Sequence, residues 1–115
     1  RYPLLPALVV NDKKYSYREV WHIATAIYRQ IPPDTLYERI GIYCNDDIYT
    51  YASIIAINMY GAAYVPINNT FPANRIKSQI ELSQLKLILS SDTHSDKVKE
   101  FSHGKTLIDT EITLH

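Results

Sequence analysis

The sequence predicts an α/β fold: a mainly parallel sheet flanked by helices and preceded by a short N-terminal hairpin. Apolar residues at helical spacing alternate with short apolar runs typical of strands along almost the whole chain. Prolines, glycines and polar turn residues separate these segments. Alternation of helix and strand favours parallel strands that are joined by right-handed crossovers and covered by helices.

The first segments predict the hairpin and a capped helix. The run ALVV, the polar residues 11–14 and the run YSY predict two short strands joined by a turn, because Asn and Asp accept tight backbone conformations. Ser16 and Glu19 have the spacing of a capping box, in which each side chain satisfies an amide at the helix start. Apolar residues at helical spacing form one face of this helix, and a double proline ends it. The residues of this face are Val20, Ile23, Ala24, Ile27 and Ile31.

The middle of the chain predicts a strand and an apolar helix. Residues Arg39–Cys44, RIGIYC, form a mostly apolar run typical of a strand. Residues 45–47, Asn-Asp-Asp, supply helix caps, and the helix is expected over about Ile48–Tyr60. Apolar residues lie nearly all round this helix, which predicts that it is largely buried. Gly61 suits the left-handed conformation that often ends a helix.

The stretch GAAYVPINNTFPANRI, residues 61–76, predicts a strand-to-helix crossover. Ala63–Ile67 is expected to be a buried strand and residues 68–70 a turn, while Pro72 suits the first position of the next helix. Ile76 and Ile80 give that helix its inner face. Beyond it, LKLIL predicts a strand, residues 92–101 a weak helix, and TLIDT a last strand.

Composition excludes several classes of function. Twelve basic and twelve acidic side chains cancel without a run of like charge, which argues against nucleic-acid binding because no basic stripe exists to bind phosphates. No apolar run approaches the roughly 18 residues of a membrane helix, and the N-terminus lacks a signal-peptide pattern, so a cytoplasmic protein without membrane contact is expected. Cys44 is the only cysteine and is interpreted as a small core residue.

The residues themselves supply no recognisable chemistry. The three glycines of the chain, Gly41, Gly61 and Gly104, lie too far apart to form a Gly-x-Gly-x-x-Gly nucleotide loop. Gly104-Lys105-Thr106 ends like a phosphate-binding P-loop, but Lys99 occupies the position of its first glycine and a strand follows. No metal-ligand spacing links Cys44 with the histidines His22, His94, His103 and His115. We therefore assign no catalytic, cofactor-binding or metal-binding residue in this chain.

Two short motifs resemble core motifs of the adenylate-forming (AMP-binding) enzymes, which include peptide-synthetase amino acid adenylation domains, D-alanine carrier-protein ligases and acyl-CoA synthetases. The first motif is matched by Tyr15, Ser16, Tyr17, Glu19 and Val20. The second is matched within the crossover stretch by Gly61, Ala63, Tyr64, Val65, Pro66, Ile67, Pro72, Arg75 and Ile76. Asn68 departs from the pattern, because amino-acid-activating members commonly carry aspartate there. Each matched residue has a sufficient structural reason, so these residues are interpreted as structural.

The resemblance implies that residues 1–115 are the N-terminal portion of an AMP-binding (adenylation) domain, incomplete and part of a larger N-terminal subdomain. The parent enzyme would use ATP and magnesium to activate a carboxylic acid as acyl-AMP, releasing pyrophosphate. Residues 63–66 favour an amino acid substrate, and a phosphopantetheine thiol on a carrier protein would receive the acyl group. The family's phosphate loop, ribose-binding aspartate and catalytic lysine are expected beyond His115, so this piece alone is predicted to be inactive.

The alternative interpretation is a stand-alone, non-catalytic interaction module with a borrowed α/β fold. In either case the apolar second helix and the sheet faces are expected to meet a neighbour, which under the enzyme interpretation is the remainder of the adenylation domain. Without that neighbour they would leave apolar surface exposed. The isolated chain is therefore expected to self-associate, by strand-edge pairing or by a swapped element.

Overall fold

The computed structural model describes residues 6–10, 13–33, 36–45, 47–93 and 95–110. An antiparallel hairpin of β1 (Pro6–Val10) and β2 (Lys13–Ser16) precedes a four-stranded sheet with the order β4-β3-β5-β6. Every strand pair in the second sheet is parallel. The elements of this sheet and its helices are α1 (Tyr17–Gln30), β3 (Arg39–Cys44), α2 (Ile48–Tyr60), β4 (Ala63–Asn68), α3 (Ala73–Ser83), β5 (Leu87–Ser90), α4 (Asp96–Phe101) and β6 (Thr106–Asp109). The predicted fold class and element order are confirmed.

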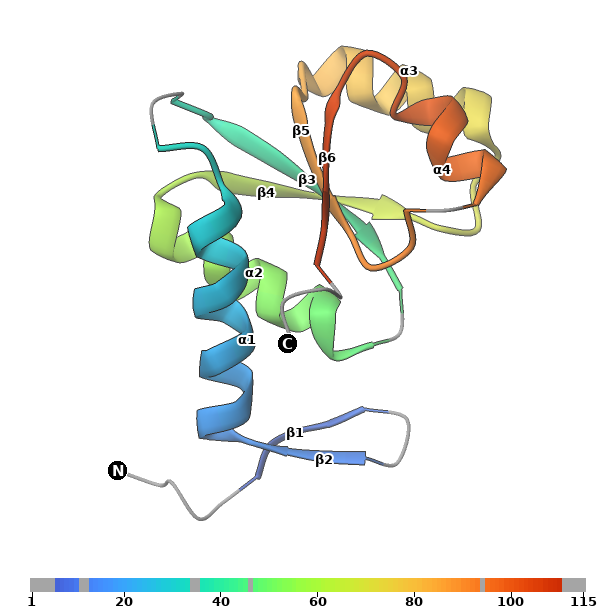
Figure 1. Cartoon of the computed structure of the whole chain (residues 1–115). Coiled ribbons are helices and arrows are strands. Elements are labelled where there is room, and N and C mark those ends of the chain that lie inside the picture. The colour runs from blue at the N-terminus through green and yellow to red at the C-terminus, as the bar shows by residue number, and fades with distance from the viewer. Residues whose placement is uncertain (1–5, 11–12, 34–35, 46, 94, 111–115) are drawn as a thin grey trace.

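The parallel sheet is covered on both faces (Figure 1). Ile40 and Ile42 of β3 pack into one core cluster with α1 and α2, whereas Tyr43 packs into a second cluster with α3 and α4. The same alternation occurs in β5, where Leu87 and Leu89 face the first cluster and the residue between them faces the second. Successive side chains of a strand point to opposite faces, so one apolar run serves both cores.

The helix boundaries follow the predicted caps closely. Ser16 is the N-cap of α1, so Tyr17, which was expected in a strand, is instead the first helical residue. Pro72 is likewise the N-cap of α3 rather than its first helical residue, since its carbonyl oxygen accepts hydrogen bonds from Arg75 N and Ile76 N, each at 3.1 Å. Gly61 ends α2 in the left-handed region at φ +98°. The predicted turn of the first hairpin includes residues 11–12, which lie outside the described residues.

One burial prediction holds in part and another is wrong. Helix α2 is buried or half-buried along most of its length, but Tyr51 is 41% exposed and Met59 36% exposed on its outer surface. Strand β4 is mainly exposed, and Ile67 is its one buried residue. The reason is topological: the chain turns back after β4 to add β5 on the other side of β3, which leaves β4 at the edge of the sheet. Pro66 suits such an edge, because it has no N–H to donate to a further strand.

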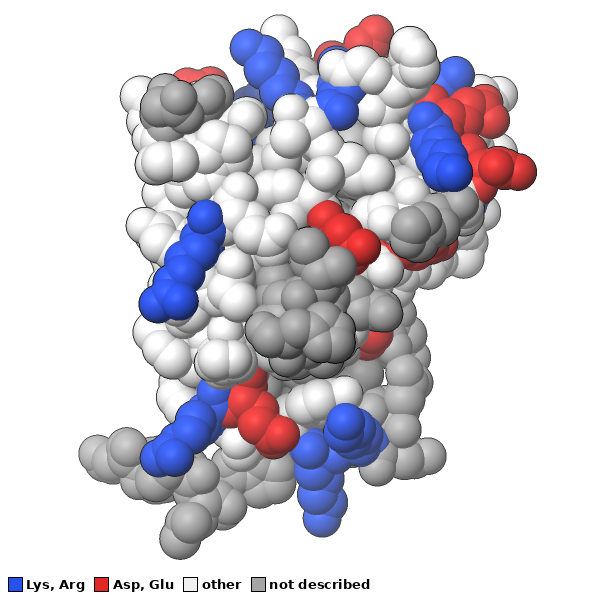
Figure 2. All heavy atoms as spheres, viewed as in Figure 1, with Lys and Arg blue, Asp and Glu red and all other residues white. Residues whose placement is uncertain are grey.

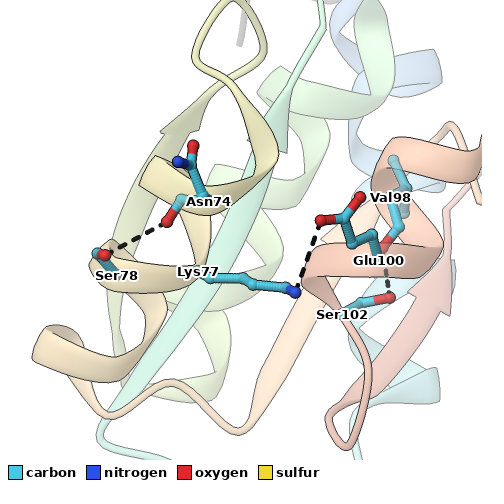
Figure 3. A network of polar contacts seen from close by, with 6 residues as sticks. All are labelled: Asn74, Lys77, Ser78, Val98, Glu100 and Ser102. Atoms are coloured by element: carbon cyan, nitrogen blue, oxygen red, sulfur yellow. Dashed lines mark hydrogen bonds and ion pairs between the residues drawn. The ribbon is translucent and has the colours of Figure 1, made fainter.

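The contact between α3 and α4 adds polar groups at the surface (Figure 3). Lys77 Nζ lies 3.6 Å from Glu100 Oε2, but both side chains are about half exposed. Exposed ion pairs of this kind contribute about 0–1 kcal/mol. The nearby Ser78 and Ser102 hydroxyls donate to carbonyl oxygens of their own helices. Of these contacts, only the Lys77–Glu100 ion pair joins α3 to α4.

Substitution of Gly41 in β3 tests this packing. A Cβ atom at Gly41 would lie 2.9 Å from Leu85 Cδ1 and 3.2 Å from Ile67 Cδ1, and both neighbours are fully buried. We expect Gly41→Val to lower the free energy of unfolding by about 1–3 kcal/mol, the usual cost of an overpacked core. Urea denaturation followed by circular dichroism measures this change. Gly104→Asn is the control, because space around Gly104 is open and Asn accepts its positive φ; equal effects of the two variants would contradict the packing argument.

Candidate functional site

The sheet order creates a switch point between β3 and β5. The chain leaves β3 toward β4 on one side, and it returns past β3 to form β5 on the other side. In open parallel sheets, ligands commonly bind in the crevice outside the carboxyl ends of the strands at such a point. The residues that directly follow β3 and β5 are therefore the first place to look for a site.

A network of polar side chains joins the loops at this switch point. Ser91 Oγ, just after β5, donates a hydrogen bond to Asp47 Oδ2 at 2.5 Å, and Asn45 Nδ2, just after β3, donates to Ser91 Oγ at 3.0 Å. Asn69 Nδ2, in the turn after β4, donates to Asn45 Oδ1 at 3.3 Å. Three loops from three neighbouring strands are thus joined to one another by side chains.

The same network caps helix α2. Asp47 is the N-cap residue, and its Oδ1 accepts from Thr50 N at 3.0 Å and from Thr50 Oγ1 at 3.2 Å. The Thr50 hydroxyl also donates to the carbonyl oxygen of Asn45 at 2.8 Å. We call Asn45, Asp47, Thr50, Asn69 and Ser91 the switch-point network. Both carboxylate oxygens of Asp47 accept hydrogen bonds from this chain, so the network holds loops together rather than presenting a free acid.

Only part of this network is predictable from local sequence patterns. Residues 45–47 are predicted as helix caps, whereas no pattern used above predicts the roles of Ser91 and Asn69. One signal could have located Ser91, because it follows β5 directly as Asn45 directly follows Cys44 of β3. The carboxyl ends of neighbouring parallel strands meet at one edge, so polar residues at those ends lie close together.

The described residues do not fit a metal or a nucleotide phosphate. Among residues that the structure describes, no group of three or more His, Cys, Asp and Glu side chains could hold a metal ion. His22 and His103 are exposed on different elements, and His94 and His115 lie outside the described residues. Gly104 has φ +81° and leads directly into β6, not from a strand into a helix as a P-loop requires.

Cys44 is half-buried at the end of β3. Burial raises the pKa of its thiol, and the nearby charge of Asp47 raises it further, although a backbone hydrogen bond at Ile67 opposes this shift. The thiolate is the reactive form of cysteine, so a raised pKa keeps this side chain in its unreactive form at neutral pH. The geometry agrees with the interpretation of Cys44 as a packing residue.

The residues matched to the first family motif lie where β2 meets α1. Ser16 Oγ accepts from Glu19 N at 3.1 Å, and Glu19 Oε1 accepts from Ser16 N at 2.8 Å, which completes the predicted capping box. These backbone and side-chain hydrogen bonds with Ser16 lower the pKa of Glu19. Tyr15 packs against the core cluster of α1 and α2, while Tyr17 is 66% exposed.

The residues matched to the second motif follow the sheet edge from α2 to α3. Ala63 N donates to the carbonyl oxygen of Glu38 at 2.9 Å, which starts β4 beside β3. The carbonyl oxygen of Pro66 accepts from Gln79 Nε2 at 2.9 Å, a contact that ties β4 to α3. Val65 packs against the second core cluster, whereas Tyr64 is 42% exposed.

Arg75 closes this second motif with an aromatic contact. Its guanidinium carbon lies 3.9 Å from the centroid of the Phe71 ring, a cation–π geometry at the start of α3. The two matched sets therefore sit on different parts of the fold, one at the hairpin and α1, the other along β4 and the start of α3 (Figure 1). The contacts of both sets are with this chain's own backbone and core.

Comparisons with known proteins agree with this geometry. The family model described as AMP-binding enzyme matches residues 1–115. N-(5-amino-5-carboxypentanoyl)-L-cysteinyl-D-valine synthase of Amycolatopsis lactamdurans is 28% identical over 104 residues, which are 88% of this chain and 3% of that protein. Tyrocidine synthase 1 of Brevibacillus parabrevis is 25% identical over 112 residues, which are 93% of this chain and 10% of that protein.

Solved structures show the same fold. The O-succinylbenzoate coenzyme A synthetase of Bacillus subtilis, in complex with ATP and magnesium ion, matches with a TM-score of 0.78 and 17% identity. The match covers 95% of this chain and 30% of that chain, so this chain spans less than a third of the solved relative. Within the described residues, no helix is both long and apolar enough to span a bilayer.

Asp47 gives a test of the switch-point network. Asp47→Ala removes the cap of α2 and the acceptor of the Ser91 hydroxyl, so we expect a loss of about 2–4 kcal/mol in the free energy of unfolding. Asp47→Asn retains the capping oxygen and is expected to lose less. Urea denaturation measures both. The matched control is Asp96→Ala in the exposed first turn of α4, expected to cost about 0.3–1 kcal/mol; an Asp47→Ala cost as small as the control's would refute the network's role.

Glu19 gives a pH-dependent test. Its pKa in the folded chain lies below the ordinary value of 4.5, so its contribution to stability is fully present above pH 4.5 and is lost as the pH falls through the lowered pKa. We expect Glu19→Gln, which keeps the hydrogen bonds but carries no charge, to show a shallower fall in melting temperature between about pH 6 and pH 3. Glu81→Gln, at an exposed position near the end of α3, should keep the parent slope. Identical slopes for Glu19→Gln and the parent would contradict the prediction.

Proposed function

Because the chain belongs to the AMP-binding enzyme family, we propose that it is the N-terminal portion of an adenylation domain, resembling those of nonribosomal peptide synthetases. The proposal rests on one observation above all, the match of the family model to residues 1–115. The proposed enzyme joins a carboxylic acid to the AMP part of ATP with release of pyrophosphate. It then transfers the acyl group to a thiol.

We propose an amino acid as the substrate. Ala63-Tyr64-Val65-Pro66 supports this choice, because the resemblance to amino-acid-activating members is carried by this run. The name of the Amycolatopsis relative describes a product that contains cysteinyl and valine units. The acceptor in the proposal is the phosphopantetheine thiol of a carrier protein. The name of the solved Bacillus relative contains coenzyme A, which presents the same phosphopantetheine thiol.

Within this enzyme, residues 1–115 are proposed to act as scaffold. The Bacillus relative is named as a complex with ATP and magnesium, but the described residues here offer neither a metal-ligand cluster nor a phosphate loop. ATP and magnesium are therefore proposed for the whole enzyme, held by residues outside this chain. The matched residues Ser16, Glu19, Gly61, Pro72 and Arg75 are proposed to serve folding, since each caps, ends or stabilises a helix.

The alternative function is a non-catalytic interaction module. The observation that favours it is the exposed apolar surface of α2, which includes Tyr51 and Met59, together with the open edge of β4. A contiguous exposed apolar surface often marks an interaction site. In this alternative the same surface would bring copies of the chain together, whereas in the adenylation domain it would meet the rest of that domain.

ATP–pyrophosphate exchange by the whole protein discriminates the proposed adenylation enzyme from the non-catalytic interaction module. We expect exchange that depends on one amino acid from a panel that also contains fatty and aromatic acids. The 115-residue chain, measured by calorimetry, is expected to give no heat of ATP binding, because the polar side chains of its switch-point network bond to one another. Exchange only with a fatty acid would remove the substrate proposal, and no exchange with any acid would favour the interaction module. ATP binding by the short chain would contradict the scaffold role.

A further inference from the structure

A hollow of about 430 Å³ lies between β2, the start of α1 and the start of α2. Its apolar lining comes from three elements: Tyr15 of β2, Ile23 of α1, and Ile48 and Tyr49 of α2. Ile23 and Ile48 are each 3% exposed and belong to the main core, so this lining is fixed by packing. The volume falls within the roughly 300–1,000 Å³ of small-molecule sites.

The rim of the hollow carries an excess of basic side chains. Lys13 and Arg18 are both exposed and line it, and His22 adds a further nitrogen donor. Lys13 Nζ lies 5.1 Å from the centroid of the Tyr15 ring, which places a cation beside the apolar lining. Figure 2 shows basic side chains at this hairpin end of the molecule with an acidic side chain between them, and both signs of charge over the rest of the face.

The acidic residue at the rim is already engaged. Glu19 Oε1 accepts a hydrogen bond from Ser16 N at 2.8 Å, so its carboxylate is directed at the start of its own helix. The capping box and Asp47 likewise satisfy amides at the starts of α1 and α2. An anion in the hollow would therefore be held by side chains rather than by helix amides. These are Arg18 and Lys13, which also lies over the Tyr15 ring and near Glu19.

We propose that this hollow is a binding site for an amphipathic anion, a molecule with one charged head and an aliphatic or aromatic body. The body would lie against Tyr15, Ile23 and Tyr49, and the head would reach Lys13 and Arg18 at the rim. Burial of apolar surface supplies affinity, and charge complementarity supplies selectivity. The proposed binding is non-covalent and is independent of the proposed adenylation activity.

Decanoate is the probe, titrated into the ¹⁵N-labelled 115-residue chain and followed by ¹H–¹⁵N correlation spectra. We expect saturable shifts that are confined to amides around the hollow. Acetate, which has the head alone, and decylammonium, which has the body with the opposite charge, are each expected to bind at least about tenfold more weakly. Equal binding of decanoate and decylammonium would overturn the proposal, as would shifts that instead map to the outer surface of α2 around Tyr51 and Met59.

Variants at the rim test the same site without disturbing the core. Lys13→Gln combined with Arg18→Gln should weaken decanoate binding about tenfold and leave the spectrum otherwise folded, because both side chains are exposed. Arg29→Gln is the matched control, an exposed arginine in the last turn of the same helix, and should leave binding unchanged. A similar loss in the Arg29 variant would assign the effect to net charge and overturn the site.

Discussion

A parallel sheet must be covered on both faces, and this requirement governs the whole chain. Strand β3 satisfies it residue by residue: Ile40 and Ile42 enter the core under α1 and α2, while Gly41 and Tyr43 face the side of α3 and α4. Full burial of one such isoleucine contributes about 1.5–3 kcal/mol. Helices on both faces need crossovers in both directions, and those crossovers create the β4-β3-β5-β6 order and the switch point.

The same arrangement places acidic side chains at the starts of two helices. Helices α2, α3 and α4 each begin at the carboxyl ends of the strands, so their positive dipole ends gather there. Asp47 and Asp96 stand at two of these helix starts, and Asp92 lies nearby in the loop after β5. At the opposite edge, beside the amino ends of β3, β5 and β6, one hollow is lined by both signs of charge: Arg39, Lys86 and Lys105 with Glu38 and Glu81.

Local rules predicted most of this fold from the sequence. The capping box at Ser16, the stop at Gly61 and the apolar runs of β3 and β5 are each determined by neighbouring residues, and the structure places these elements as predicted. The exposure of Tyr51 and the edge position of β4 depend instead on strand order, which no local pattern contains. AYVPIN reads as a buried strand in isolation, and only the reversal of the chain after β4 exposes it.

The candidate site divides along the same line. Asp47 could be assigned as a cap because its partner, Thr50, is three residues away, whereas its bond to Ser91 joins residues that are far apart in the sequence. In open parallel sheets, ligands commonly bind outside the carboxyl ends of the strands at such a switch point. In this chain the side chains of Asn45, Asp47 and Ser91 form hydrogen bonds with one another, and these bonds hold the loops after β3 and β5 together. A fold can therefore retain a strand order that forms ligand sites in other proteins while the polar groups at its switch point bond to one another and hold the loops in place.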